Sequence, residues 1–356
     1  MPNKRFLNAL QGKPQETPPI WLMRQAGRYH SHYQNLKKTY SFEDLCKTPR
    51  LAAETAMGPI VDFDFDVAIL FSDILFPLES LGMDLSYDPG PKFSELLSEE
   101  NYKKIFNQHL PIQSLDFQAE AIERTIEKLP EDKSMIGFVG GPWTLLSYAM
   151  GKNKEKDIDD LSQFEWDIVE NELIPLLKEN ISLQIKAGAE IIMIFDSAAN
   201  QLSKRDFDKY IRIVFKEIVL NFNNKVGYYA KDGVDYLLIE NIKKELQVPL
   251  AGLGIDSSEL ITDFFRSSRE GFIQGNFDEK IMTQSKETME RSLDKFIEEI
   301  STFSAKDRVG WICGLGHGVL KTTPEENVRS FVKKIRKAFV GLLLANRILI
   351  TILQKK

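Results

Sequence analysis

The most distinctive chemistry in the sequence comes from two arginines four residues apart. Arg24 and Arg28 lie in LMRQAGRY (residues 22–29), directly after the apolar run 18–22. If the chain becomes helical after Met23, both side chains share one helix face, where like charges repel by roughly a few tenths of a kcal/mol unless an anion lies between them. This spacing therefore predicts a site for an acidic ligand.

Other polar side chains stand at the ends of apolar runs. Asp73 ends VAILFSD, Ser197 ends IIMIFDS, and His317 lies between glycines in CGLGHG. Because functional groups of parallel α/β folds collect at the carboxyl ends of the strands, we expect these side chains to converge. Asp73 has two interpretations: it caps the helix predicted after it, or it places a negative charge at the bottom of a pocket.

Several acidic and histidine side chains have simpler interpretations. His30 and His32 stand in a polar helical stretch and are predicted to lie on the surface. Asp62, Asp64 and Asp66 alternate with phenylalanine in VDFDFDV and predict a solvated turn. We assign no catalytic role to these five residues.

The sequence gives little support for a metal or a cofactor. Cys313 and His317 are four residues apart, but a catalytic zinc ion takes three protein ligands, and Cys46 lies in a helical stretch. No GxxxxGK[ST] phosphate loop occurs, no GxGxxG links a strand to a helix, and no GxSxG motif is present. The residues therefore give only weak support for a metal site and none for a phosphate loop or an acyl nucleophile.

The elements that must position these residues alternate along the chain. Runs rich in β-branched and aromatic residues predict strands, and the longer amphipathic stretches between them predict helices. This alternation predicts a single-domain α/β fold, a (β/α)8 TIM barrel, with a doubly wound sheet as the alternative. The eight predicted strands cover residues 18–23, 67–72, 135–140, 190–197, 225–231, 249–256, 271–278 and 309–316.

Composition limits the class of protein further. Of the 356 residues, 43% are hydrophobic and 28% are charged, which is typical of a soluble domain with a large core. The net charge of -6 argues against a nucleic-acid surface, which needs clustered lysine and arginine. Two cysteines and an N-terminus without an apolar signal core favour the reducing cytoplasm.

The C-terminus differs from the rest of the chain. We expect residues 1–340 to form the barrel and residues 341–356 to form an apolar and basic helical tail. Arg347 interrupts the apolar stretch 338–354, which falls short of the ~20 residues that a membrane-spanning helix needs. The simplest interpretation is a helix packed on the barrel or on a dimer partner; attachment to a membrane surface is the alternative.

Taken together, the motifs resemble those of one family, the uroporphyrinogen decarboxylases of haem biosynthesis. The resemblance extends from residue 5 to about residue 340, in the order and spacing of the family. The motifs that carry it are PPIWLMRQAGRY (18–29), AILFSDILFPLESLGM (68–83), GFVGGPWTLLSYAM (137–150), IFDS (194–197), IQGNFD (273–278) and GLGHGV (314–319).

The resemblance implies a homodimeric (β/α)8 barrel that binds uroporphyrinogen as a small-molecule substrate, without cofactor or metal. Such enzymes remove carbon dioxide from four acetate side chains to give coproporphyrinogen. By motif, Arg24 and Arg28 are implied to bind substrate carboxylates, and Asp73 to accept pyrrole N–H groups. The other implied pocket residues are Gln25, Ala26 and Gly27, through their backbone, and Tyr148, Ser197 and His317.

The chain departs from the family pattern at three places. His30-Ser31-His32 replaces the Leu-Pro-Glu usual after RQAGRY, and Gly58 stands where the family has glutamine. The family's Asp-Trp pair after the sixth strand appears as Asp256-Ser257. These departures predict altered packing and loop conformation at the rim of the pocket.

Two other functions remain compatible with parts of the pattern. A corrinoid-linked methyltransferase of the related barrel group uses zinc to activate a thiol, but it needs a His-x-Cys pair and a later cysteine, which this sequence lacks. A non-catalytic carrier of tetrapyrroles or polyanions would keep Arg24 and Arg28 and would have no need for Asp73.

Overall fold

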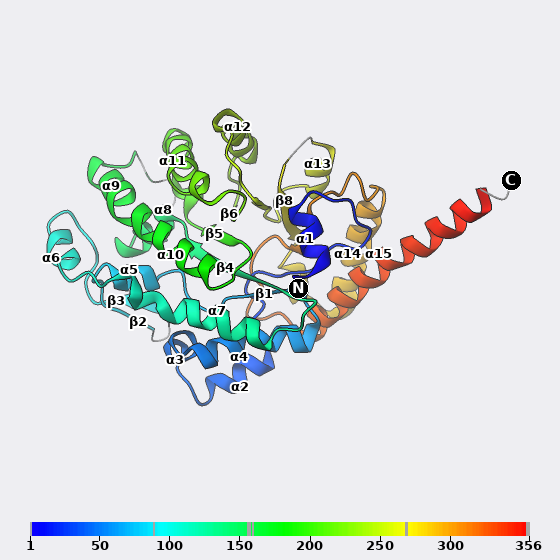
Figure 1. The fold of residues 1–356 in the computed structure, drawn as a ribbon, viewed down its shortest axis with the longest axis horizontal. Coiled ribbons are helices and arrows are strands. Elements are labelled where there is room, and N and C mark those ends of the chain that lie inside the picture. Colours follow the sequence, from blue (N-terminus) through cyan, green and yellow to red (C-terminus); the bar gives the residue numbers. More distant parts are fainter. Residues whose placement is uncertain (1, 88–89, 155–157, 159, 268–269, 354–356) are drawn as a thin grey trace.

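A parallel sheet of seven strands forms the centre of the molecule, with helices around its outside (Figure 1). The computed structural model describes residues 2–87, 90–154, 158, 160–267 and 270–353. The strands follow one another in the sheet in chain order, as in a barrel. They are β1 (Val67–Ile69), β4 (Ser134–Gly140), β5 (Ile192–Asp196), β6 (Val226–Ala230), β7 (Gly252–Gly254), β8 (Phe272–Phe277) and β9 (Trp311–Leu315).

The first predicted strand, residues 18–23, is not a regular strand. We call it the closing segment, because it lies between the two edges of the sheet. Ile20 forms an isolated parallel bridge with Cys313 of β9, and its carbonyl accepts a hydrogen bond from Asp66 N, next to β1, at 3.0 Å. Pro18 and Pro19 have no N–H group, which limits the ladder that this segment can form. The predicted (β/α)8 fold is confirmed, with seven regular strands and a short eighth connection.

Helices cover the outer face of the sheet, as the alternating pattern predicts. Pro49 at the first position of α4 and Pro142 at the first position of α8 have the fixed φ that favours a helix start. The longer helices are α4 (Pro49–Phe63), α7 (Asp116–Lys128), α8 (Pro142–Ala149), α10 (Ile174–Lys186), α11 (Lys204–Glu217), α12 (Tyr236–Leu246), α14 (Lys286–Ser301) and α15 (Glu325–Leu353). The shorter ones are α1 (Lys4–Leu10), α2 (Ser31–Lys37), α3 (Phe42–Lys47), α5 (Phe76–Ser80), α6 (Tyr102–Phe106), α9 (Gln163–Ile168) and α13 (Ile261–Arg266).

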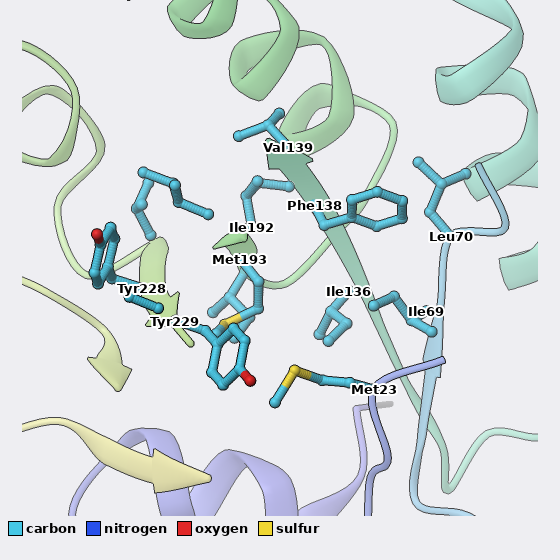
Figure 2. Close-up of a cluster of buried hydrophobic side chains, with 14 of the residues drawn as sticks. Met23, Ile69, Leu70, Ile136, Phe138, Val139, Ile192, Met193, Tyr228 and Tyr229 are labelled. Atoms are coloured by element: carbon cyan, nitrogen blue, oxygen red, sulfur yellow. The ribbon is translucent and has the colours of Figure 1, made fainter. Parts of the chain in front are cut away.

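Apolar side chains fill the interior of the sheet. All seven residues of β4 are buried, as expected for a strand covered on both faces. Figure 2 shows Met23 pointing from the closing segment toward Tyr229 of β6. Ile69, beside Met23, and Phe138 of β4 belong to the same cluster. This packing holds the residues after the closing segment against the strand ends.

Asp66 corrects the prediction of a solvated turn. Its side chain is only 1% exposed, and its carboxylate accepts hydrogen bonds from Ile20 N at 2.7 Å and from Asn3 Nδ2 at 3.0 Å. Arg5 of α1 and Arg336 of α15 each approach it to 2.9 Å. A buried carboxylate needs such partners, so Asp66 joins both ends of the chain to the closing segment.

His30 corrects the prediction of a surface residue. Its side chain is fully buried, its ring packs against Phe63 with centroids 4.9 Å apart, and Nε2 lies 2.7 Å from Asp62 Oδ2. His32 is half-buried. The helix α2 thus places its first residues against α4, and the Asp62 carboxylate supplies a partner for the ring of His30.

The C-terminal helix α15 continues across residue 340 without a break and projects away from the strands in Figure 1. The predicted helical tail is therefore part of a longer helix up to Leu353. Side chains from residue 340 onward lie outside the described part of the structure, and so does the backbone of residues 354–356. Among the described residues, no helix is long and apolar enough to cross a membrane.

Candidate active site

A pocket of about 200 Å³ lies at the carboxyl ends of the strands. Residues from the closing segment, β1, β4, β5, β6 and the loop after β9 contribute to it, as expected for parallel strands. Its polar lining comes from Arg24, Gln25, Ser72, Asp73, Ser197, Tyr229 and His317. Its other lining residues are Met23, Ala26, Ile69, Leu70, Phe71, Ile74, Phe138, Phe195 and Gly318.

The segment with the two arginines forms turns rather than a helix. Arg24 has a left-handed backbone, with φ at 58°, so the expectation that Arg24 and Arg28 share a helix face is wrong. Left-handed φ is uncommon outside glycine and costs about 1 kcal/mol or more. Strain of this kind often marks functional positions, and here it turns Arg24 into the pocket.

The buried side chain of Gln25 holds this loop in place. Its Nε2 donates to Val67 O of β1 at 2.9 Å, and its Oε1 accepts from Leu22 N at 3.4 Å. Its backbone carbonyl accepts from the hydroxyl of Tyr29 at 2.7 Å. Gln25 therefore connects the arginine loop to the first regular strand, a role for its side chain that the motif alone did not indicate.

The stem of Arg24 lies directly on Gly318. A Cβ at position 318 would come within 2.6 Å of Arg24 Cδ and 2.8 Å of Arg24 Cγ. Because Gly318 has no side chain, the aliphatic part of Arg24 can pack on the loop after β9.

Asp73 lies beyond β1 at the floor of the pocket. Its Oδ1 accepts a hydrogen bond from Leu75 N at 2.9 Å, while α5 begins at Phe76 with Leu75 as its N-cap. The helix-cap interpretation is therefore wrong, because Asp73 forms a turn ahead of the helix. Burial raises the pKa of Asp73 above its ordinary value, and hydrogen bonding from Leu75 N and the Tyr87 hydroxyl, together with the Arg24 charge, offsets this rise only in part.

His317 also lines the pocket, where the charge of Arg24 acts on it. Its Nδ1 is 3.1 Å from Gly318 O, which orients the ring. Burial lowers the pKa of His317, and the nearby positive charge of Arg24 lowers it further. The ring is therefore neutral near pH 7 and offers hydrogen bonding rather than positive charge.

An aromatic wall on three consecutive strands was missed in the sequence. Phe138 of β4 and Phe195 of β5 have ring centroids 5.6 Å apart, and Phe195 and Tyr229 have centroids 6.1 Å apart. Tyr229 is buried and donates a hydrogen bond to Gly316 O at 3.0 Å. The only sequence signal was their position near the ends of predicted strands, since an aromatic residue there is more often part of the core.

Not every predicted residue reaches the pocket. Arg24, Gln25, Ala26, Asp73, Ser197 and His317 line it, whereas Gly27, Arg28 and Tyr148 lie outside its lining. Arg28 is exposed on the surface, and Tyr148 is half-buried on α8.

Asp196, which ends β5, serves the fold instead. It is fully buried and accepts hydrogen bonds from Thr144 at 2.6 Å, Tyr210 at 2.5 Å and Tyr228 at 3.1 Å. These three hydroxyl groups compensate for its burial, so Asp196 braces the strand that carries Ser197.

Within the part of the chain that the structure describes, no three His, Cys, Asp or Glu side chains gather closely enough to hold a metal ion. Cys313 and His317, which are four residues apart, have no third such ligand beside them there. Cys313 is fully buried within β9.

Comparison with known proteins decides the family. The model of the family described as uroporphyrinogen decarboxylase (URO-D) matches residues 1–338. This chain belongs to the uroporphyrinogen decarboxylase family. Its similarity to uroporphyrinogen decarboxylases extends over nearly the whole of both chains. It is 32% identical to the one from Orientia tsutsugamushi over 93% of this chain and 98% of the relative, and 31% identical to the one from Geobacter sulfurreducens over 94% and 98%.

Solved structures share the fold of this uroporphyrinogen decarboxylase family member at much lower identity. A methyltransferase from Methanosarcina mazei is 17% identical, with a TM-score of 0.64 over 95% of this chain and 98% of that one. A putative vitamin-B12 independent methionine synthase from Listeria monocytogenes is 11% identical, with a TM-score of 0.51 over 92% and 98%. These structural similarities show a shared fold only.

Proposed function

We propose that the protein decarboxylates uroporphyrinogen III at its four acetate side chains and so produces coproporphyrinogen III. The observation that carries this proposal is Asp73, a buried carboxylate that lines the pocket. Membership of the uroporphyrinogen decarboxylase family supports the reaction class. The arrangement of Arg24 and His317 around the same pocket supports an acidic substrate.

The chemistry needs an electron sink, because loss of carbon dioxide leaves an electron pair on the former acetate carbon. A pyrrole ring that has taken a proton on its α-carbon is a cation conjugated to that carbon, and it accepts the pair. Asp73 accepts pyrrole N–H groups and stabilises the cation as it forms. Such preorganised charge often contributes more to catalysis than any other single effect.

The arginines bind the carboxylates of the substrate. Guanidinium groups bind carboxylates through two parallel hydrogen bonds and stay charged when partly buried. Arg24 lines the pocket, and Arg28 stands exposed near it on the same loop. In this proposal the pocket of about 200 Å³ takes one pyrrole ring with its acetate. The remaining carboxylates then extend toward the two arginines.

His317, Tyr148 and Ser197 complete the substrate site in this proposal. Neutral His317 hydrogen-bonds a substrate carboxyl group beside Arg24, and the α-carbon receives its proton from a carboxyl group or water that an arginine holds. Ser197 supplies a hydroxyl from the end of β5. Tyr148 of α8 assists from outside the enclosed pocket, and the backbone of Gln25, Ala26 and Gly27 shapes the substrate side of the loop.

The deciding experiment is anaerobic incubation of chelator-treated protein with uroporphyrinogen III, followed by oxidation and chromatography of the porphyrins. We expect coproporphyrin, preceded by products with seven, six and five carboxylates. Activity that disappears on chelation and returns with zinc would favour the methyltransferase type of site. Binding without any product would favour a carrier.

The Asp73→Asn variant separates an enzyme from a carrier within the same assay. We expect the variant to bind the porphyrinogen and to lose most of its turnover, because the amide cannot stabilise the pyrrole cation. A carrier has no use for that charge. Full activity in Asp73→Asn would show that Asp73 has no cation-stabilising role.

We further propose that the protein acts as a homodimer in the cytoplasm. The family resemblance supports the dimer, and two buried cysteines without a disulfide support a reducing compartment. Light scattering after gel filtration should give twice the mass of the chain. Fractionation of the source cells should recover the protein with cytoplasmic markers.

A further inference from the structure

A buried hydroxyl near the pocket has no role in the mechanism so far. Tyr87 ends β2 (Leu85–Tyr87), which pairs antiparallel with β3 (Pro91–Phe93). Its Oη is buried, and among the described residues no hydrogen bond of regular geometry reaches it, although it lies close enough to the Asp73 carboxylate to act on it as a side-chain donor. Most buried polar atoms in proteins are paired, because leaving one unpaired costs free energy. An unpaired hydroxyl of this kind therefore calls for an explanation.

The position of the Tyr87 ring does not depend on this hydroxyl. Phe42 of α3 and Phe76 of α5 pack against the ring, with centroid distances of 4.9 Å and 5.8 Å. Figure 1 shows the β2–β3 hairpin between α5 and α3. Phe76 begins the helix that follows the Asp73 turn. The aromatic contacts thus fix Tyr87 relative to the segment that carries Asp73.

The neighbouring groups leave one suitable acceptor for the hydroxyl. The charged or ionisable groups that act on it are Asp73, Cys46 and Glu79. Glu79 is already paired with Lys47 at 2.9 Å, and a thiol such as that of Cys46 is a weak acceptor. Asp73 uses Oδ1 for Leu75 N, and the Tyr87 hydroxyl is the side-chain donor that acts on its carboxylate.

The protonation states suit a bond from Tyr87 to Asp73. Burial raises the pKa of Tyr87, and the charge of Asp73 raises it further, so the phenol keeps its proton and can donate it in a hydrogen bond. Arg24 is the positive group that acts on Asp73 from the other side. A hydrogen bond from a hydroxyl to a carboxylate is stronger than one between neutral groups.

We propose that Tyr87 is a positioning residue for Asp73: its hydroxyl donates a hydrogen bond to the carboxylate when a pyrrole ring occupies the pocket. This proposal rests on the proposed decarboxylation. The bond keeps Asp73 ionised and oriented while its other contacts change from water to pyrrole N–H groups. Asp73 can then meet the developing cation without reorganisation, which is the condition for electrostatic catalysis.

The test compares Tyr87→Phe with wild type in the anaerobic decarboxylation assay. The variant keeps the aromatic ring and loses only the hydroxyl. We expect kcat to fall roughly tenfold with little change in KM, as for the loss of one charge-assisted hydrogen bond that acts in the transition state. The acid limb of kcat/KM should move to higher pH, because the pKa of Asp73 rises when a donor to its charged form is removed.

Tyr102→Phe is the matched control. Tyr102 also packs between two phenylalanine rings, with centroid distances of 6.2 Å to Phe106 and 5.2 Å to Phe164. Tyr102 is not among the groups that act on Asp73. Its variant should match wild type in kcat and in the pH profile. Melting temperatures of both variants should stay close to that of wild type.

The outcomes are distinguishable. Product from wild type together with a Tyr87→Phe variant that has unchanged kcat and pH profile would overturn the positioning role alone. A fall in kcat without a shift of the acid limb would also overturn it, because a purely structural defect does not change the pKa of Asp73. Absence of product from wild type would overturn the proposed decarboxylation, and the role of Tyr87 with it.

Discussion

The ring of His32 lies directly on Gly58. A Cβ at position 58 would come within 2.4 Å of His32 Cδ2, much closer than real Cβ contacts allow. Both residues are among the departures from the motif pattern noted in the sequence. Because the two departures meet where α2 packs on α4, they are parts of one packing arrangement: the imidazole occupies the space that a side chain on α4 would need.

This contact predicts that the effect of Gly58→Ala changes sign with the residue at position 32. In wild type the added methyl group meets the imidazole, and overpacking of this kind typically costs about 1–3 kcal/mol. In a His32→Ala background the space is free, and alanine should stabilise the interior of α4 by up to about 1 kcal/mol relative to glycine. Urea unfolding of the four proteins in the double-mutant cycle measures both effects. Equal effects in the two backgrounds would contradict the contact.

The left-handed backbone of Arg24 predicts a trade of activity for stability. Arg24→Gly should raise the free energy of unfolding by about 1 kcal/mol, because glycine adopts φ near 58° without strain. The same change should abolish turnover by removing a carboxylate ligand. Arg28→Gly is the control, since Arg28 is not among the residues with positive φ and should gain no stability. A loss of stability in Arg24→Gly would show that its contacts outweigh the strain.

The raised pKa of Asp73 predicts a pH-dependent cost to folding. A folded-state pKa above the unfolded value means that the folded protein binds the proton more tightly, so ionised Asp73 destabilises the fold at neutral pH. Asp73→Asn should therefore be more stable than wild type at pH 8, and the difference should shrink as the pH falls toward the ordinary pKa of an aspartate, about 3.9. Denaturant unfolding across this range measures it.

Asp44→Asn should change the folding stability at pH 8 in the opposite direction. Hydrogen bonds from Ser41 lower the pKa of Asp44, so its carboxylate contributes stability at neutral pH that is lost on acidification. Its replacement should destabilise the protein at pH 8. If both aspartate variants changed stability in the same direction at pH 8, the burial effect at Asp73 would be wrong.

Burial of His30 predicts acid sensitivity near the arginine loop. Burial lowers the pKa of His30, and the hydrogen bond with Asp62 offsets this only in part. The unfolded chain then binds the proton more readily, so stability present above about pH 6.5 is lost as the pH falls below it. His30→Leu should flatten this dependence between pH 7 and pH 5, as measured by melting temperature. His109→Leu, at an exposed position, should leave the slope unchanged.

The positions of the strands along the chain were predictable because each strand has its own local hydrophobic pattern. The run 135–140 reads as a buried strand without knowledge of its neighbours, and β4 occupies residues 134–140. The run 18–23 was also predicted as a strand but forms only an isolated bridge, since its two prolines cannot donate to a ladder. Asp73 and His317 were found because they stand where strands end and because family motifs contain them.

The errors in prediction have a common physical cause. Asp66 looked solvated because its partner Arg336 lies 270 residues away in the chain. His30 looked exposed because its partner Asp62 and its neighbour Phe63 belong to a different helix. Tyr229 was not singled out, because a local pattern does not show which residues of β6 line the pocket. Such pairings depend on tertiary structure, which a local pattern does not contain.

The buried carboxylate of Asp66 obtains one of its partners only late in translation. Arg336 follows it by 270 residues, which at about 5–20 residues per second is a delay of roughly 15–55 s. Cys313, which pairs with the closing segment, is made only shortly before. During translation the nascent chain therefore carries the arginine loop without the strand that holds it. A ribosome stalled before residue 313 would display a chain unable to bind a tetrapyrrole, and binding competence would arrive only with the last tenth or so of the protein.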